Sequence, residues 1–230
     1  MNIFDYSIEA YLSNIHFGHF ATRAIAAFAD FYMFKGLVLI AVLWWLWFQP
    51  DVRREWRREM VIATFLSGTV AFFSARLLTH WLPFRLRPVY NTELGLHFGD
   101  AANRGTAMLD WSSFPSDHAM LWMAVATGIL LISPRAGLLA LLYTVLFICA
   151  PRAYLGLHYP TDLLVGAAMG IAITFFMTRD AIRKRIAAPT LRWIERYQAS
   201  SATIAFILCI QLVTQFDELR HLAKGVFDHL

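Results

Sequence analysis

Residues 118–152 read HAMLWMAVATGILLISPRAGLLALLYTVLFICAPR and form two apolar runs joined by a short turn at 134–136. A helix that spans a membrane needs about 20 mainly apolar residues, within a range of about 17–25. Both runs come close to that length. Four more runs of the same character flank this pair, at 31–48, 60–78, 161–178 and 202–216. The pattern predicts an all-α, polytopic membrane helical bundle with about six transmembrane helices. Because Gln211 interrupts the last run, that segment either spans the membrane or lies in the interface.

The composition agrees with a membrane protein. Of the 230 residues, 58% are apolar and 16% are charged, whereas an average soluble domain has about 45–50% apolar and about 25% charged residues. These values exclude a disordered chain, a disulfide-rich secreted module and an ordinary soluble enzyme. An outer-membrane barrel is excluded as well, because its strands would be segments of about 10 residues with alternating polarity.

Two further segments lie outside the main apolar runs. Before the first run, Phe17, Phe20, Ala24 and Phe28 recur at helical spacing, which predicts an N-terminal amphipathic helix at the membrane surface. After the fifth run, residues 179–230 combine a basic segment with an extra C-terminal helix. No repeat, low-complexity tract or long linker divides the chain, so residues 1–230 are predicted to form a single domain.

The basic residues gather at 53–58, at Arg135 and at 179–196. A net charge of +4 is compatible with nucleic-acid binding or with the excess of Lys and Arg found in cytoplasmic loops. Since these residues flank the apolar runs, we favour the second interpretation and expect membrane lipids, not nucleic acid, as partners. With these basic segments on the cytoplasmic side of the inner (plasma) membrane, residues 79–117 and 152–160 lie on the extracytoplasmic side. The oligomeric state stays open.

Almost all candidate catalytic and phosphate-binding residues lie in or directly beside these two extracytoplasmic stretches. They form three groups, which are His80, Arg85, Arg87 and Pro88, then Pro115, Ser116, Asp117 and His118, then Arg152, His158 and Asp162. Ionisable groups at membrane depth are costly unless they are paired or functional. The sequence therefore predicts one functional site at this face.

These residue types suit the hydrolysis of a phosphate ester. Arg87 and Arg152 can bind phosphate oxygens, because a guanidinium group donates two parallel hydrogen bonds to them. Ser116 and the backbone N–H groups that open the third run add donors at a helix N-terminus. His158 precedes Asp162 by four residues, so the carboxylate can fix the imidazole tautomer and leave the other nitrogen free to attack phosphorus. A phosphohistidine intermediate follows from this arrangement.

The three groups resemble the signature motifs of the type 2 phosphatidic-acid phosphatase superfamily. In words, these motifs are Lys-x6-Arg-Pro, Pro-Ser-Gly-His and Ser-Arg-x5-His-x3-Asp. The matching residues are His80-x6-Arg87-Pro88, Pro115-Ser116-Asp117-His118 and Arg152-x5-His158-x3-Asp162. The order and the spacing both fit, and the motif core covers residues 60–178. Three spaced motifs are far more specific than one short pattern.

The resemblance implies a membrane-embedded lipid phosphatase that needs no metal and no cofactor. The matched positions make His158 the nucleophile, His118 the acid that protonates the leaving oxygen, and Asp162 the residue that orients His158. Arg87, Arg152 and Ser116 would hold the phosphate.

Three positions depart from the family pattern. His80 stands where the family has Lys, so that a fixed positive charge becomes a titratable one, and Arg76 or Arg85 would substitute for it. Pro151 replaces the family's Ser and removes a hydroxyl donor. Asp117 replaces Gly, but its N–H remains available. We expect His80, Arg85 and Asp117 to be further phosphate-binding residues.

The Pro-Ser-Asp-His form resembles the bacitracin-resistance type of undecaprenyl-pyrophosphate phosphatase. The expected substrate is therefore undecaprenyl pyrophosphate, cleaved to undecaprenyl phosphate and phosphate for carrier recycling in cell-wall or surface-polysaccharide synthesis. Phosphatidic acid, phosphatidylglycerol phosphate and lipid A phosphate are alternative substrates. We expect the loop 89–114 to set the selectivity.

Three other classes of function remain as alternatives. A non-catalytic binder or transporter of lipid phosphates would keep the same pocket. A vanadate haloperoxidase would share the motif, although the apolar runs argue against that soluble class. A metal site made of His118, His158 and Asp162 is disfavoured, because the two arginines would repel a cation.

Overall fold

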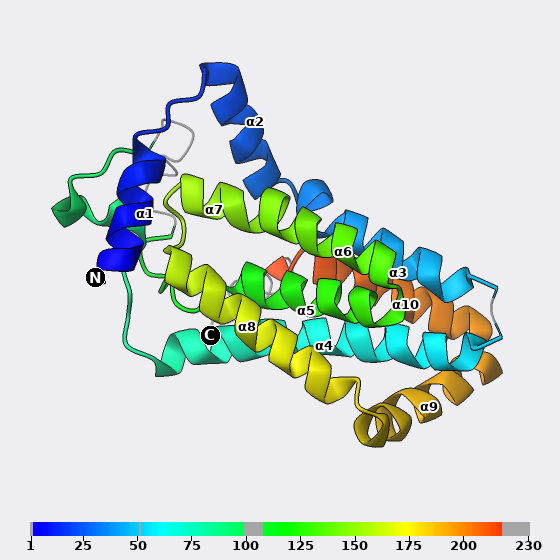
Figure 1. The fold of residues 1–230 in the computed structure, drawn as a ribbon. Coiled ribbons are helices and arrows are strands. Elements are labelled where there is room, and N and C mark those ends of the chain that lie inside the picture. Colours follow the sequence, from blue (N-terminus) through cyan, green and yellow to red (C-terminus); the bar gives the residue numbers. More distant parts are fainter. Residues whose placement is uncertain (1, 51, 99–107, 218–230) are drawn as a thin grey trace, which may run out of the picture.

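The computed structural model describes residues 2–50, 52–98 and 108–217, and within these ranges all regular structure is helical (Figure 1). This confirms the all-α prediction. The elements are α1 (Ile3–Ser13), α2 (His19–Asp30), η1 (Met33–Leu37), α3 (Val38–Phe48), α4 (Arg54–Trp81), η2 (Pro88–Tyr90), η3 (Thr92–Leu94), α5 (Asp117–Ile132), α6 (Pro134–Tyr143), η5 (Thr144–Cys149), α7 (Ala150–Tyr154), α8 (Pro160–Met177), α9 (Asp180–Arg196) and α10 (Gln198–Val213).

Helix α5 is the centre of the bundle. It packs against α4, α6 and α8, and Met120, Leu121, Trp122 and Val125 are all fully buried. A helix that is surrounded by other helices needs apolar residues on every side. This explains why the 118–133 run shows no polar face.

Two glycines allow α8 to lie unusually close to α5. A Cβ added to Gly170 would lie 2.1 Å from the carbonyl oxygen of Met120, and one added to Gly166 would lie 2.6 Å from that of Ser116. Only glycine permits such a backbone approach. The contact brings the beginning of α8 next to the beginning of α5, where two of the three sequence motifs lie.

The predicted count of about six spans is not confirmed. Three helical segments in the described residues are long and apolar enough to cross a membrane, namely Arg54–Trp81, Pro134–Tyr154 and Pro160–Met177. A fourth exists if His19–Asp30 and Phe34–Phe48, which meet at a 68° bend, form one broken span. The α5 and α10 helices are shorter apolar helices. The α5 helix has 16 residues and packs along the candidate spans α4 and α8, so its length alone does not decide whether it crosses the membrane.

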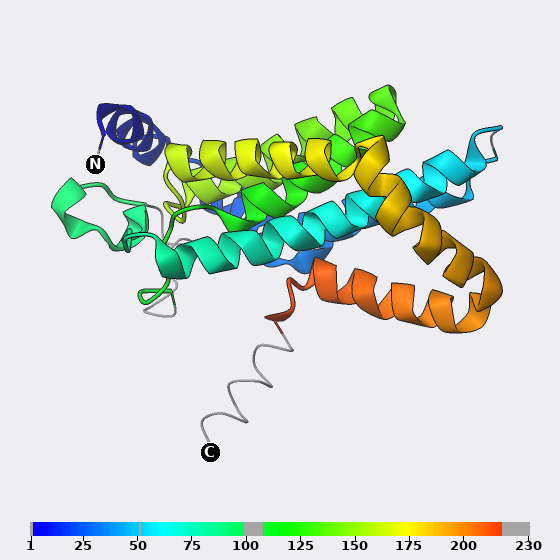
Figure 2. The same ribbon diagram turned by 90° about the horizontal axis from the view of Figure 1, so that it is seen from below.

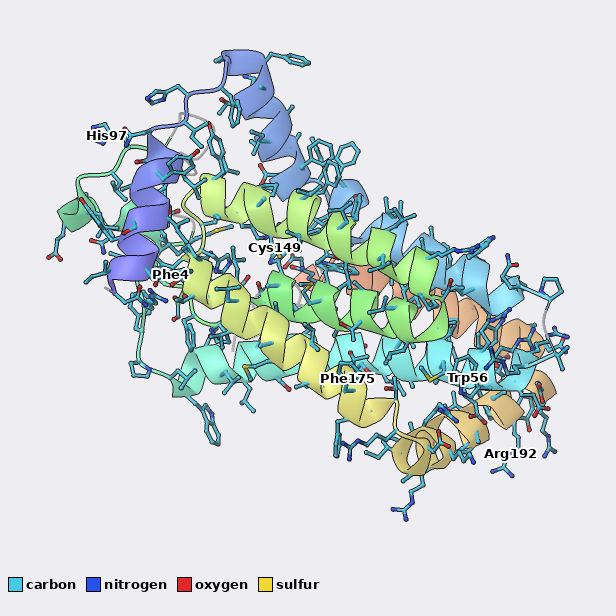
Figure 3. The ribbon with its side chains drawn as sticks, in the orientation of Figure 1. Phe4, Trp56, His97, Cys149, Phe175 and Arg192 are labelled. Carbon is cyan, nitrogen blue, oxygen red and sulfur yellow. The ribbon has the colours of Figure 1, made fainter. Side chains whose placement is uncertain are left out.

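The two ends of the bundle differ in character. At one end α9 and the beginning of α4 carry the basic residues, and Figure 3 shows Trp56 and Arg192 there. At the other end lie α1, η2 and η3, with Phe4 and His97. From α9 the chain returns along the bundle in α10, which runs back toward that second end (Figure 2).

The N-terminal region contains one helix more than we expected. The predicted amphipathic helix corresponds to α2 (His19–Asp30), whereas α1 (Ile3–Ser13) precedes it and contacts α7 and α8. The α1 helix was missed because it carries the buried acidic residues Asp5 and Glu9, which interrupt its apolar pattern.

Candidate active site

The three motif stretches meet at the end of the bundle that holds α1. Backbone hydrogen bonds join them directly. The N–H of Ser113 donates to the Arg85 carbonyl at 2.8 Å, and the N–H of Ser116 donates to the Asp162 carbonyl at 3.2 Å. Gly156, with a φ of +63°, turns the chain between α7 and α8. Its carbonyl accepts a hydrogen bond from the N–H of Val89 at 2.9 Å. The site is therefore built on main-chain contacts.

His158 is buried in the turn before α8, with 4% of its surface exposed. Its Nδ1 lies 2.8 Å from the carbonyl oxygen of Ser113, and its Nε2 lies 3.3 Å from Nη1 of Arg87. A carbonyl oxygen can only accept, so Nδ1 carries the hydrogen and Nε2 keeps its lone pair. Burial, followed by the Arg87 charge, holds the pKa of His158 well below its ordinary value. The imidazole is thus neutral at pH 7, as a nucleophile requires.

Asp162 has a different role from the one we expected. Its Oδ2 lies 3.9 Å from Nδ1 of His158, which is too long for a hydrogen bond. The carboxylate instead accepts from the backbone N–H of Tyr159 at 2.9 Å and pairs with Arg85. The expected contact is replaced by the Ser113 carbonyl, because capping the first turn of α8 engages Asp162. Asp162 fixes the turn that carries His158.

Both predicted phosphate-binding arginines are buried near His158. Arg87 donates from Nη1 to the Leu157 carbonyl at 2.7 Å, and Arg152 donates from Nη1 to the Ile148 carbonyl at 2.6 Å. These bonds hold one edge of each guanidinium group. The Nε atom of Arg87 has no hydrogen-bond partner, so this side chain retains a donor for a ligand.

Asp117 connects the predicted acid to a cation. Its Oδ1 accepts from Nδ1 of His118 at 2.7 Å, and its Oδ2 pairs with Nη2 of Arg76 at 2.7 Å. Asp117 lines both cavities, but its carboxylate is engaged with two side chains, so the expected phosphate contact would come from its backbone N–H and not from its carboxylate. The Nε2 atom of His118 is buried and has no partner. This arrangement leaves Nε2 as the atom that can exchange a proton with substrate.

Two adjoining cavities meet at His158. The larger, of about 800 Å³, is lined by His80 and by aromatic side chains that include Phe72, Phe73 and Phe84. The smaller, of about 290 Å³, is lined by Lys35, Arg152 and His118. Both cavities share the residues Arg76, Arg87, Trp111, Asp117, His158 and Gln215. The smaller cavity holds four basic side chains (Lys35, Arg76, Arg87 and Arg152) and three acidic ones (Asp30, Asp117 and Asp217), and this excess of positive charge next to an aromatic cavity suits a phosphorylated lipid.

Ser116 and Arg85 do not line either cavity. Ser116 is fully buried, and its hydroxyl caps α5 by accepting from the N–H of Ala119. The guanidinium of Arg85 pairs with Asp5 at 2.6 Å as well as with Asp162. Of the two arginines that we considered as substitutes for the family's Lys, only Arg76 reaches the site.

Several residues of this region were missed from the sequence. Asp5 on α1 accepts from the N–H of Thr161 at 2.9 Å in addition to its pair with Arg85. Glu9 is buried beside it, and burial, together with the charge of Asp5, raises the pKa of Glu9 to about 8. Lys35 interrupts the first apolar run, and an ionisable residue inside such a run is a functional candidate by default. That signal was available, whereas nothing in the pattern marked Gln215.

Comparison with known proteins identifies the family. A model of the PAP2 superfamily matches residues 59–186, which is more than half of the chain. The chain belongs to the PAP2 superfamily. Its membership supports a membrane phosphatase that acts on a lipid phosphate. The PAP2 match includes all three motifs but ends before α10.

The sequence identity between this chain and individual related proteins is low. The chain is 29% identical over 150 residues to the bacitracin transport permease protein BcrC of Bacillus licheniformis, a match that covers 64% of this chain and 65% of that protein. The match thus spans slightly less than two thirds of the length of BcrC.

Two solved structures share the PAP2 fold. The first is a phosphatidylglycerolphosphate phosphatase from Bacillus subtilis, with a TM-score of 0.52 at 17% identity over 79% of this chain and 85% of that one. The second is LpxE from Aquifex aeolicus, with a TM-score of 0.51 at 24% identity over 77% and 98%. At these identities the likeness concerns the fold alone.

The described residues contain no group of three or more His, Cys, Asp or Glu side chains arranged to hold a metal ion. The alternative metal site of His118, His158 and Asp162 therefore has no geometric support in this part of the chain.

Proposed function

We propose that this PAP2 protein hydrolyses the terminal phosphate of a polyprenyl diphosphate, with undecaprenyl pyrophosphate as substrate and undecaprenyl phosphate plus phosphate as products. The observation that carries the proposal is the position of His158 Nε2, which bears no hydrogen and whose lone pair faces Nη1 of Arg87 at 3.3 Å, where the two cavities meet. The Pro-Ser-Asp-His stretch and the similarity to BcrC support the choice of lipid.

The proposed reaction has two steps. First, Nε2 of His158 attacks the terminal phosphorus and the bond to the bridging oxygen breaks, while His118, which must be doubly protonated when the anionic substrate is bound, gives its Nε2 proton to that leaving oxygen. Then a water molecule attacks the phosphohistidine, the bond between phosphorus and Nε2 of His158 breaks, His118 takes a proton from that water, and phosphate leaves. Arg87, Arg152 and Arg76 stabilise the charge on the phosphoryl oxygens.

We also propose that the site faces the extracytoplasmic side of the inner membrane and that residues 1–230 act as one unit. The basic residues of α9 and of the beginning of α4 lie at the end of the bundle opposite to α1 (Figure 3), and α1 contacts α8, which His158 directly precedes. Basic residues favour the cytoplasmic side. A site at that depth lets a charged headgroup react without entering hydrocarbon.

The test is phosphate release by detergent-purified protein in the presence of EDTA. Undecaprenyl pyrophosphate, phosphatidic acid, phosphatidylglycerol phosphate and lipid A phosphate are assayed side by side, with His158→Ala as the inactive control. We expect release from the polyprenyl diphosphate that persists in EDTA and is lost in the variant. Release from another lipid alone would overturn the substrate, and no release by folded protein would favour a non-catalytic binder.

A further inference from the structure

The turn formed by residues 214–217, directly after α10, reaches the site from outside the PAP2 match. It follows Val213, whereas the family model ends at residue 186. Gln215 of this turn lines both cavities, together with Arg76, Arg87 and His158. None of the three sequence motifs includes it.

The side chain of Gln215 is buried without a hydrogen bond on its nitrogen. The residue is 4% exposed, and its Nε2 has no partner. A buried amide donor that lacks an acceptor costs free energy, so such a group in a native structure calls for an explanation. The part of the site that Gln215 lines also contains Arg76, Arg87 and Asp117. Since the carboxylate of Asp117 is already engaged with Arg76 and His118, an anionic oxygen of a ligand is the acceptor that fits.

The turn holds this side chain firmly in place. Gln215 and Phe216 have φ values of 55° and 56°, in a region that residues other than glycine adopt only under constraint. Phe216 stacks on Phe72 with the ring centroids 5.7 Å apart, and its N–H donates to the Gln211 carbonyl at 2.8 Å. Asp217 accepts a hydrogen bond from the hydroxyl of Tyr32. These contacts fix the backbone on the C-terminal side of Gln215.

We propose that Gln215 donates a hydrogen bond to the lipid-side phosphate of a diphosphate headgroup and so favours diphosphates over monophosphates. The terminal phosphorus lies at His158, in the part that both cavities share, and the lipid extends into the aromatic cavity. Gln215 lines the same shared part and can therefore reach the second phosphate on the lipid side. This assignment rests on the proposed function, because it presupposes a lipid diphosphate in these cavities.

The kinetic test compares farnesyl diphosphate with farnesyl monophosphate as substrates. Gln215→Met keeps the size of the side chain but removes the donor. Gln211→Met, one turn earlier on α10 and outside both cavities, is the matched control. We expect Gln215→Met to lower kcat/KM for the diphosphate by about tenfold or more, mainly through KM, with a clearly smaller loss for the monophosphate. Gln211→Met should match the wild type.

A binding measurement separates this inference from the proposed function. Pyrophosphate and phosphate are added to each purified protein, and the rise in Tm is recorded. We expect pyrophosphate to stabilise the wild type and Gln211→Met more than Gln215→Met, and phosphate to stabilise all three equally. If the wild type shows this binding but hydrolyses neither farnesyl substrate, the proposed function fails and the Gln215 contact stands.

Three outcomes would overturn the role of Gln215. One is an active wild type whose kinetics and pyrophosphate response are unchanged in Gln215→Met. Another is an equal loss on both farnesyl substrates, which would place the contact away from the second phosphate. The third is a wild type that neither turns over these substrates nor responds to pyrophosphate, and in that case both proposals fail.

Discussion

At the scale of the residue, two departures from the PAP2 motifs compensate each other. The family's Lys is absent at His80, and an Asp stands at 117 where the family has Gly. The carboxylate of Asp117 binds Arg76 at 2.7 Å and so holds a cation in the part that the two cavities share. One substitution therefore supplies the charge that the other removes, and the same carboxylate orients His118.

This coupling predicts different effects for two variants. Asp117→Asn keeps an acceptor for Nδ1 of His118, whereas Asp117→Ala leaves both His118 and Arg76 without their partner. We expect Asp117→Ala to lower kcat by about 10²-fold or more, the range lost with a general acid, and Asp117→Asn to retain more of it. Steady-state kinetics on the preferred lipid measures this difference. Equal rates in Asp117→Ala and the wild type would show that the bridge is dispensable.

The sequence predicted which residues gather in the cavities better than it predicted their partners. His158, Arg87 and Arg152 were named from the spacing of the motifs, and all three line one cavity although only Arg152 lies on a helix. The partner of His158, the Ser113 carbonyl, was not predictable, because a backbone oxygen leaves no trace in residue type. Gln215 was missed for another reason, since its approach depends on how α10 packs and not on any local pattern.

At the scale of the element, α1 acts as a clamp on the beginning of α8. Asp5 binds both Arg85 and the N–H of Thr161, and Glu9 is buried one turn further along α1 with neither carboxyl oxygen hydrogen-bonded. With a pKa of about 8, Glu9 is protonated in the folded protein at pH 7. In the unfolded chain a Glu ionises near its ordinary value of about 4.3.

The raised pKa of Glu9 makes stability depend on pH. Between roughly pH 4.5 and pH 8 the folded state holds a proton that the unfolded state has released, so the contribution of Glu9 becomes less favourable as pH rises through this window. We therefore expect Glu9→Gln, which is neutral throughout, to raise Tm most at pH 8 and least near pH 4.5. Thermal unfolding of both proteins across this range tests the prediction. A Tm difference that does not change with pH would contradict it.

The α5–α8 contact gives a prediction for a second element. Gly170→Ala would place a Cβ 2.1 Å from the backbone of Met120, and a backbone cannot move aside as a flexible side chain can. We expect the helices to separate, with a clear fall in Tm and a loss of activity because His158 moves with α8. Gly18→Ala is the control, since its Cβ would meet nothing within 4 Å. A Gly170→Ala protein as stable and active as the control would refute the need for this approach.

At the scale of the whole molecule, the separation of charge and site along the bundle predicts the topology. Glu93 lies in η3 at the end that holds the site, and Arg192 lies in α9 at the basic end, both of them exposed. In a variant with Cys149 and Cys209 replaced by Ala, we expect Glu93→Cys to react with a membrane-impermeant maleimide in intact spheroplasts. Arg192→Cys should react only after the cells are permeabilised. The reverse pattern would place the site in the cytoplasm.

The fold class followed from composition, but the number of spans did not. Apolar runs reveal that a segment avoids water, yet they do not say whether lipid or protein surrounds it. The α5 helix shows the difference, because its apolar residues contact α4, α6 and α8. The bend between α2 and α3 falls at the start of the 31–48 run, where the sequence already separated the amphipathic segment from the first apolar run.

The position of Gln215 after α10 has a consequence for biogenesis. A nascent chain that has been inserted through α8 already contains every motif residue, from His80 to Asp162, but it does not yet contain the turn that reaches the two cavities. Asp5 on α1 is likewise without its partner Thr161 until the beginning of α8 has been synthesised. The proposed headgroup site is therefore complete only after α10 and the turn that follows it have been inserted.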